Sequence, residues 1–415
     1  MSDSREQNRQ SARRTVLMGA LVIAFVAAWF GAGFLPIVPN DLDIFFWPSA
    51  QAALAGHPLA AYSHAPLDQY PNANQNGPVL LVPLTLIGTL VQSLGLMQTL
   101  YPRRAITLAF FSFFILLMAR EGVAAIERLR GNRLAGRWRL LAYGALAAGP
   151  PVWQSLAGFG HIEQPFEVWF VLLAIRWLDA DRPARSGVAL GLAVLSRSIA
   201  GLYAIPIALH AWRRRPMAIP LMAIAASATA LVGLLPFYLA DPASLMTSLF
   251  TNRGLLIVGA GSIWTLSTGT VFEQVAQHYD VVFIALLALA ANAWLAMRPG
   301  GLTGQRLFAA LALTAASFVL LAKTVWPYYL MEIYVFATVW SAGAWRPKYG
   351  WQRLVLPPIA IAALGALAEF GSTPHLARDA VMLEGVAMFV LLGATFVWLL
   401  AAASGAAARS SISEV

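Results

Sequence analysis

Cysteine is absent from this chain of 415 residues, and charged side chains are scarce. Without cysteine there is no disulfide framework and no cysteine-ligated metal or redox centre. Charged residues make up 11% and apolar residues 59% of the sequence, against about 25% and 45–50% in soluble domains. A mean hydropathy of +0.67 excludes an ordinary soluble globular protein and indicates a membrane protein.

Apolar runs of about 20 residues, the length that crosses a bilayer, recur along the whole chain. They predict an all-α polytopic protein with about 10–12 transmembrane helices. Residues 1–415 form one integral-membrane domain in this interpretation, because no separate soluble segment or repeat is seen. The net charge of +9 does not indicate a nucleic-acid partner, because the basic residues follow the positive-inside pattern.

The arginines predict the orientation of the first span. Four arginines in residues 1–14 precede an apolar run at residues 15–34, which is longer than the core of about 7–15 residues in a cleaved signal peptide. We therefore expect a cytoplasmic tail and an uncleaved first span. Residues 35–77 contain neither lysine nor arginine, so they are expected to form a first outer loop with a helix along the membrane surface.

Only one of the next two apolar stretches, residues 78–97 and 105–119, should cross the membrane. Six arginines in residues 120–139 belong in the cytoplasm, and two crossings would leave them outside. Pro83 and Gly88 interrupt the first stretch, so we predict that it crosses only in part. This choice places Arg103 and Arg104 near the outer face.

A hairpin of two short helices is predicted at residues 186–210, because basic residues stand at both of its ends. Arg197 then lies near the tip of the hairpin inside the membrane, where an arginine costs about 2.5–3.5 kcal/mol unless it faces a cavity or an anion. A second outer loop is predicted at residues 240–280, and the C-terminus is expected in the cytoplasm. The remaining spans are expected at residues 138–156, 165–178, 217–239, 281–297, 307–322, 328–344, 354–369 and 380–403.

Polar side chains that could bind a ligand gather on the predicted outer face. Asp41 and Asp43 follow the first span and precede a cluster of three aromatic residues. Carboxylates beside aromatic rings and lipid suit a polar ligand such as a sugar. The other outer polar positions are His57, His64, Asp68, His161, Glu163, Asp241 and the stretch KTVWPYY at residues 323–329.

Six short stretches occur in a recognisable order: NDLDIF (40–45), AGHPLAAY (55–62), NQNGPVLLVPL (74–84), FGHIE (159–163), LSRSIAGLYAIP (195–206) and VWPYYL (325–330). They resemble, in turn, the DLxxY, G-x-P, Tyr-Pro-Pro, YGQxN, GxKxxP and WxHHW motifs of the GT-C glycosyltransferases. The closest resemblance is to the polyprenol-phosphate-mannose-dependent α-mannosyltransferases of bacterial envelopes. The departures are Pro78 for a doubled proline, Arg197 for a lysine, His161 and Glu163 for Gln and Asn, and Tyr328 and Tyr329 for paired histidines.

The resemblance implies an inverting membrane glycosyltransferase of the bacterial inner membrane. It would move a sugar, mannose in the closest family, from a polyprenyl-phosphate donor to a hydroxyl of a lipid or envelope glycan on the outer face. Asp41 matches the family acid and would be the general base. Arg197 would bind the donor phosphate. No cofactor is implied, and the other candidate substrate contacts are Asp43, His161, Glu163, Tyr328, Tyr329 and Glu332.

Both aspartates also have a structural interpretation. Asn40 can serve as a helix N-cap with Asp43 as its capping-box partner. Residues two apart on a helix point about 200° apart, so we assign capping to Asp43 and chemistry to Asp41. The D-x-D spacing is also that of a Mn or Mg site, but a helix keeps the two carboxylates apart and a monophosphate donor does not require an ion. We therefore predict no metal.

The other candidate residues have alternatives that the sequence leaves open. Arg197 could pair with backbone carbonyls at a helix break instead of a phosphate. Trp326, Tyr328 and Tyr329 could form an interfacial aromatic belt instead of a sugar platform. Glu332 lies one turn inside the following span and could pair with Arg197 or with Lys323.

Two other protein classes compete with an enzyme. Secondary transporters also use broken helices and charges inside the membrane, although the crowding of polar residues on one face favours a transferase. A non-catalytic assembly or lipid-scrambling subunit is the third class. Within the transferases, arabinose or glucose could replace mannose as the donated sugar.

Overall fold

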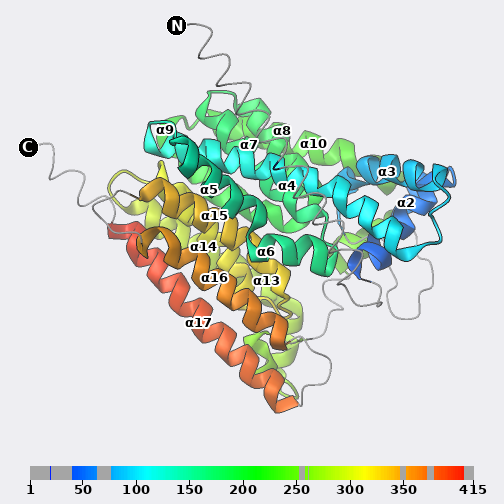
Figure 1. Cartoon of the computed structure of the whole chain (residues 1–415). Helices are drawn as coiled ribbons and strands as arrows, with labels where there is room; N and C mark the ends of the chain where they lie inside the picture. Colours follow the sequence, from blue (N-terminus) through cyan, green and yellow to red (C-terminus); the bar gives the residue numbers. More distant parts are fainter. Residues whose placement is uncertain are drawn as a thin grey trace, which may run out of the picture.

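The computed structural model of the chain is built of helices (Figure 1). It describes residues 19, 40–62, 76–251, 258–259, 261–345, 352–371 and 378–405, and none of these forms a strand. The all-α prediction is confirmed for this part of the chain. The predicted cytoplasmic tail, all but one residue of the first span, and His64 and Asp68 of the first outer loop lie outside the described residues.

Most of the predicted spans coincide with helices. The longer helices are α3 (Leu81–Ser93), α4 (Leu100–Arg130), α5 (Gly136–Ala148), α7 (Glu163–Asp179), α8 (Pro183–Ser196), α9 (Ala204–Arg214), α10 (Ala218–Ala240), α13 (Val271–Met297), α14 (Gln305–Leu321), α15 (Leu330–Ala344), α16 (Gln352–Gly371) and α17 (Arg378–Gly405). The short segments are η1 (Leu42–Phe46), α2 (Trp47–Leu54), η2 (Pro58–Tyr62), η3 (Pro78–Leu80), α6 (Pro150–Trp153), η4 (Gln154–Phe159), η5 (Ser198–Tyr203), α11 (Pro242–Met246), η6 (Thr247–Thr251), η7 (Ile263–Ser267) and η8 (Pro327–Tyr329).

Four of the described helices are long and apolar enough to cross a membrane: α4, α10, α13 and the Met382–Ser404 part of α17. Their length and composition support an all-α membrane protein. The stretch at residues 105–119 lies within the 31 residues of α4, whereas residues 78–97 give only η3 and the 13-residue α3. The shorter apolar helices are Pro78–Ser93, Gln305–Leu321 and Leu356–Gly365.

The two ends of the helix bundle are defined by α7. His161, just before α7, contacts Asp41, and Asp179, the last residue of α7, contacts Arg214. A helix of 17 residues spans about 24 Å at 1.5 Å per residue. We call the two regions the Asp41 end and the Arg214 end. Arg128 lies within electrostatic reach of Asp179, so the basic C-terminus of α4 joins that of α9 at the Arg214 end.

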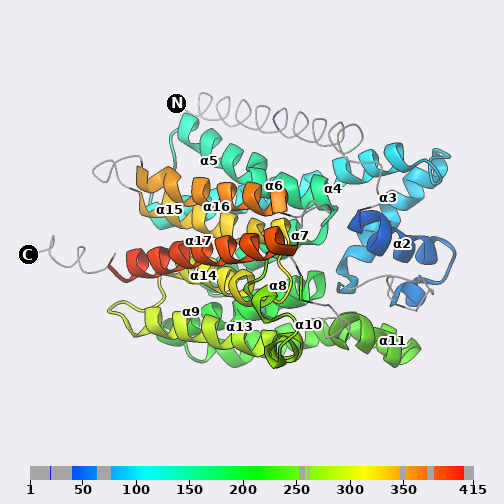
Figure 2. The same ribbon diagram turned by 90° about the horizontal axis from the view of Figure 1, so that it is seen from below.

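The centre of the fold is formed by α14 and α15, whose side chains are almost all buried. In Figure 2, α14, α15, α16 and α17 lie as one group in which each helix packs on the next. At the opposite side α10 packs on α8 and exposes most of its apolar side chains. Apolar exposure over a 23-residue helix is expected where lipid covers the surface.

The predicted hairpin is a reversal of the chain. α8 ends at Ser196, and the backbone of Arg197 is extended, with φ −155° and ψ 126°. The 3₁₀ turn η5 then leads into α9, which returns in the opposite sense. Arg197 therefore lies at a helix break inside the bundle, as its position in the sequence predicts.

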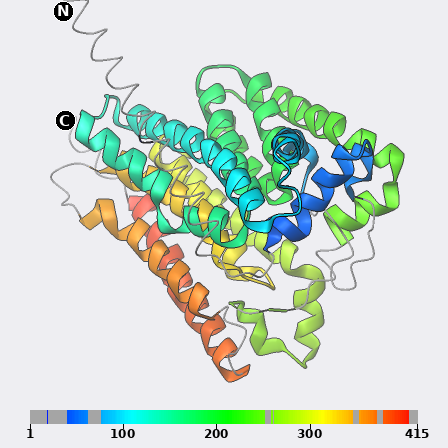
Figure 3. The same ribbon diagram turned by 45° about the vertical axis from the view of Figure 1, so that its right-hand side comes forward.

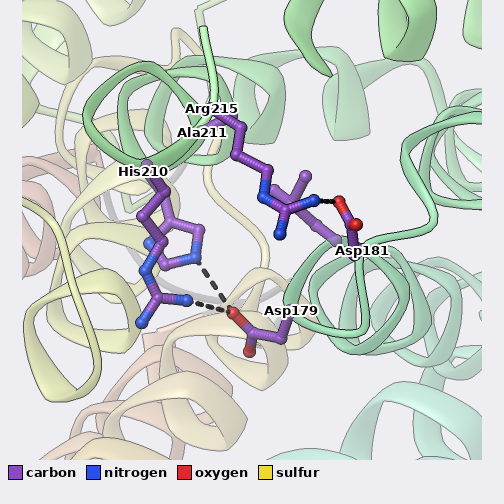
Figure 4. Close-up of a pocket in the computed structure, with 7 residues that line it drawn as sticks. Asp179, Asp181, His210, Ala211 and Arg215 are labelled. Carbon is purple, nitrogen blue, oxygen red and sulfur yellow. Dashed lines mark hydrogen bonds and ion pairs between the residues drawn. The ribbon is translucent and has the colours of Figure 1, made fainter. Parts of the chain in front are cut away.

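Ion pairs hold the two ends of this hairpin together at the Arg214 end. They surround a pocket of about 220 Å³ that Figure 4 shows. Asp179 lies 3.1 Å from Nε2 of His210 and 2.9 Å from Nη1 of Arg214. Arg215 pairs with Asp181 at the start of α8. The segment just before α8 and the end of α9 are thus neighbours.

α8 and α10 approach closely at Gly187 and Gly191. A Cβ atom built on Gly191 would lie 2.7 Å from the Ala226 carbonyl oxygen and 2.7 Å from Cβ of Thr229. Glycines four residues apart let two membrane helices bring their backbones together. This close packing fixes the first arm of the hairpin that carries Arg197.

Replacing Gly191 with alanine should destabilise the protein, because the new Cβ pushes against the backbone of α10. We expect the free energy of unfolding to fall by about 1–3 kcal/mol. Gly201→Ala is the matched control, because a Cβ at Gly201 meets nothing within 4 Å. Thermal unfolding in detergent measures both variants. Equal unfolding midpoints for the two variants would contradict the close α8–α10 contact.

Candidate functional site

Asp41 lies at the start of the helix formed by η1 and α2. The Asn40 carbonyl accepts hydrogen bonds from the amides of Asp43 (2.9 Å) and Ile44 (3.0 Å), so the helix begins at this point. The Asp41 side chain is 29% exposed, and its Oδ2 lies 2.6 Å from Nε2 of His161. Its Oδ1 has no hydrogen-bond partner among the residues that the structure describes. One carboxylate oxygen is therefore fixed and the other is open.

His161 connects Asp41 to Glu163. Its Nδ1 contacts Oε1 of Glu163, and its ring stacks on Tyr328 with 3.6 Å between centroids. Burial lowers the pKa of His161, but the charge and hydrogen bond of Glu163 and those of Asp41 outweigh burial and raise the pKa to about 9. At neutral pH the ring is therefore an imidazolium that donates to both carboxylates.

Gly160 makes the contact between this turn and the Asp41 helix possible. Its φ of +77° lies in the left-handed region that favours glycine. A Cβ at this position would lie 2.7 Å from the amide nitrogen of Leu42. The end of η4 can thus approach η1 closely enough for His161 to reach Asp41.

Asp43 points to different partners. Its Oδ1 lies 2.9 Å from Nη2 of Arg103, and its Oδ2 lies 2.5 Å from Nη2 of Arg104. The Arg103 guanidinium also lies over the Trp47 ring at 5.1 Å. The Asn40 amide lies 3.4 Å from Oδ2 of Asp43, which is one half of the predicted capping box. The Asn40 side chain makes no hydrogen bond to a described residue, so the predicted N-cap contact of Asn40 is wrong. Figure 3 shows the blue α2 near the start of the cyan α4, and α3 packs on both α2 and α4.

The two aspartates therefore do not converge on one ion or ligand. Asp41 contacts the turn before α7, whereas Asp43 pairs with the first turn of α4. This arrangement explains why Arg103 and Arg104 lie at the Asp41 end, away from most other arginines. In the part of the chain that the structure describes, no group of three or more His, Cys, Asp or Glu side chains is arranged to hold a metal ion.

Arg197 lies buried between two carboxylates. Its Nη1 pairs with Glu332 and lies 3.5 Å from Oε2 of Glu167. Its Cζ lies 5.0 Å from the centroid of the Tyr329 ring, a cation–π contact. The Nη2 and Nε edge of the guanidinium makes no hydrogen bond to any described residue. Glu332 thus pairs with Arg197, which is one of its two predicted partners.

The first turns of α7 join the Asp41 and Arg197 clusters. Gln164 donates from Nε2 to Oε1 of Glu332 at 3.2 Å, and Glu163 lies next to Gln164 in sequence. The charges of both Asp41 and Arg197 also act on the Tyr328 hydroxyl group. The structure therefore brings seven of the eight predicted site residues into one continuous network: Asp41, His161, Glu163, Arg197, Tyr328, Tyr329 and Glu332.

Sequence reasoning missed Glu167, Gln164 and the pairing of Asp43 with Arg104. The first two had a detectable signal, because Glu163 and Glu167 stand four residues apart and therefore share one face of α7. An acidic residue inside an apolar span is also a functional signal by itself. The Asp43 pairing had no such signal, because 61 residues separate its partners.

Comparison with known proteins leaves the site to be interpreted from its own chemistry. The chain matches no family model and no curated protein. The GT-C glycosyltransferase resemblance therefore stays a prediction, and the geometry has to carry the argument for function.

Replacing Asp43 with asparagine should destabilise the protein far more than the same change at Asp41. Asp43→Asn removes a carboxylate between two buried or nearly buried guanidinium groups, which costs about 3–5 kcal/mol. Asp41→Asn keeps an acceptor for His161 and should cost about 1 kcal/mol. Chemical unfolding in detergent tests both. A larger loss at Asp41 would contradict the structural role of Asp43.

The His161 imidazolium should make stability depend on pH. Its pKa is about 9 in the folded protein and about 6.5 in an unfolded chain. Its contribution is therefore complete below about pH 6.5 and is lost as the pH rises to about 9. We expect the unfolding midpoint of the wild type to fall more steeply between these values than that of His161→Gln. Parallel curves would show that His161 is not held as an imidazolium.

Proposed function

We propose that this chain is an integral-membrane glycosyltransferase with its active site at the Asp41 end. It moves a sugar from a polyprenyl-phosphate donor to a hydroxyl of a lipid or glycan acceptor. One observation carries this proposal: Asp41, with one oxygen fixed and one open, belongs to the same network as the cation Arg197. A base for the hydroxyl and a cation for the phosphate are the two groups that such a transfer requires.

In the proposed reaction Asp41 acts as general base. Oδ1 accepts the proton of the acceptor hydroxyl while its oxygen forms a bond to the anomeric carbon of the donor. The bond between that carbon and the phosphate oxygen breaks, and polyprenyl phosphate leaves with the electron pair. Attack from the face opposite the leaving group inverts the anomeric configuration. No general acid is required, because a phosphate monoester is already a weak base.

The charges around Asp41 suit the transition state of this reaction. Glycosyl transfer develops positive charge on the sugar ring, and the carboxylates of Asp41 and Glu163 lie on two sides of His161. The open Nη2 and Nε edge of Arg197 can bind two phosphate oxygens side by side. Glu167 and Glu332 hold the guanidinium in place at Nη1.

The hairpin that carries Arg197 is the element that we propose reaches a lipid-linked donor. In this proposal α8, η5 and α9 form a re-entrant hairpin that enters the membrane from the cytoplasm and carries Arg197 to the depth of the donor phosphate. Both chain ends then lie in the cytoplasm, and Asp41 faces the outer side of a bacterial inner membrane. Mannose is the sugar that the GT-C motifs favour, and the mechanism needs no metal or other cofactor.

A secondary transporter is the second candidate, and one observation favours it. His161, Glu163, Glu167 and Glu332 form a buried network of acids and a base between helices, and proton-coupled carriers use such networks. Asp41 argues for the transferase, because its open oxygen lies at the start of η1, at one end of the bundle.

Asp41→Asn should abolish most transfer of radiolabelled mannose from polyprenyl-phosphate mannose in membranes. Loss of a general base lowers the turnover number by about 10²–10⁴-fold, whereas the KM for the donor should hardly change. Asp181→Asn is the matched control, because Asp181 pairs with Arg215 at the opposite end of the bundle. A wild-type turnover number in Asp41→Asn would remove Asp41 from the mechanism.

A further inference from the structure

Three aromatic rings continue from His161 towards the surface, and we call them the aromatic platform (Phe159, Trp326 and Tyr328). Tyr328 stacks on His161 with 3.6 Å between centroids. Phe159 lies 5.2 Å from Tyr328 and 6.4 Å from Trp326, again between centroids. Tyr328 is buried, Phe159 is half-buried and Trp326 is 38% exposed. The platform therefore leads from the Asp41 network to an open indole ring.

Short, restrained loops hold these rings in place. Phe159 is the last residue of η4 and precedes the left-handed Gly160. Trp326 stands at the start of η8, where Pro327 keeps the preceding residue extended, and its carbonyl accepts a hydrogen bond from the Tyr329 amide at 3.0 Å. The platform is thus formed by the same two loops that supply His161 and the Tyr329 ring over Arg197.

We propose that the aromatic platform binds a pyranose ring of the acceptor, so that the acceptor is a glycan or glycolipid. This inference rests on the proposed transferase function and specifies its substrate. The C–H face of a sugar ring packs on an aromatic face, and the indole ring offers a large contact area at little cost in side-chain entropy. The rings of Phe159 and Trp326 connect through Tyr328 to His161. His161 contacts Asp41, so a sugar bound on the platform lies next to the network that holds the candidate base.

An interfacial belt explains the platform less well. Aromatic side chains of a belt contact lipid with their own rings, whereas Tyr328 is buried against His161 and Phe159. Only Trp326 has the exposure that a belt residue needs. A series of rings that ends at the candidate base Asp41 is the arrangement expected of a sugar subsite.

Saturation-transfer NMR tests sugar binding directly. The full chain, purified in a detergent without a sugar head group, is titrated with methyl α-D-mannopyranoside while the aromatic protons of the protein are irradiated. We expect saturation on the C–H protons of the sugar ring. Trp326→Ala should weaken this binding by about tenfold, as expected for loss of a stacking contact of about 1.4 kcal/mol. Trp326→Phe should bind nearly as well as the wild type, because it keeps a ring.

Two controls make the result specific. Trp212→Ala removes an indole that is 65% exposed near the end of α9, at the Arg214 end, and should bind the sugar like the wild type. Glycerol, which has no ring face, should receive no saturation. Equal binding by the wild type, Trp326→Ala and Trp326→Phe, or no binding by the wild type, would overturn the proposal. If Trp326→Ala does not fold, Trp326→Phe is compared with Phe159→Ala. Trp326→Phe keeps an aromatic ring at position 326, whereas Phe159→Ala removes a ring of the platform. Equal losses of sugar binding in these two variants would also overturn the proposal.

The binding measurement requires no turnover, so its failure differs from failure of the transferase. If the wild type transfers mannose and Trp326→Ala keeps full sugar binding, the platform proposal is wrong and the transferase proposal stands. If the wild type binds the sugar through Trp326 but breaks no sugar–phosphate bond of the donor, the transferase proposal is wrong and the sugar site stands.

Discussion

The position of the Asp41 side chain depends on one interaction, the His161 imidazolium between the carboxylates of Asp41 and Glu163. It joins the surface helix of η1 and α2 to the first turn of α7, two elements that are 120 residues apart in sequence. A buried cation between two anions is stable only because each charge faces an opposite one. The same clamp fixes one oxygen of Asp41 and leaves the other open, which makes the orientation of the candidate base a consequence of folding.

Two other clusters of buried charges follow the same rule. Asp43 faces Arg103 and Arg104, and Arg197 faces Glu167 and Glu332. Buried ion pairs are weak contributors to stability, since the loss of hydration offsets most of the attraction. Their presence in an apolar bundle is therefore better explained by function than by stability. Asp43 and Arg104 anchor the helix that carries Asp41, and Arg197 is the cation that we propose for the donor phosphate.

Much of the fold could be predicted, because the lengths of the apolar runs and the positions of the arginines depend on which segments cross the membrane. The span at residues 217–239 became α10 with its bounds moved by one residue, and the reversal at Arg197 followed from the basic residues at both ends of the hairpin. The start of α13 at Val271 was missed by ten residues, because Thr270 caps a polar first half that hydropathy does not detect. Contacts such as Asp43 with Arg104 depend on tertiary packing, so no spacing in the sequence could predict them. Resemblance to motifs named six residues of the network, and Glu332 was named from its position in the following span. Only the structure shows that His161 connects Asp41 to the rest.

The central claim is that this network breaks a sugar–phosphate bond instead of moving an intact molecule. Purified protein in liposomes that contain polyprenyl-phosphate mannose, labelled in both the sugar and the phosphate, tests it most directly. A transferase separates the two labels, with mannose recovered on a glycan acceptor and phosphate recovered as polyprenyl phosphate in equal amounts. Recovery of the doubly labelled donor, intact but moved to the opposite leaflet, would contradict the account and identify a transporter.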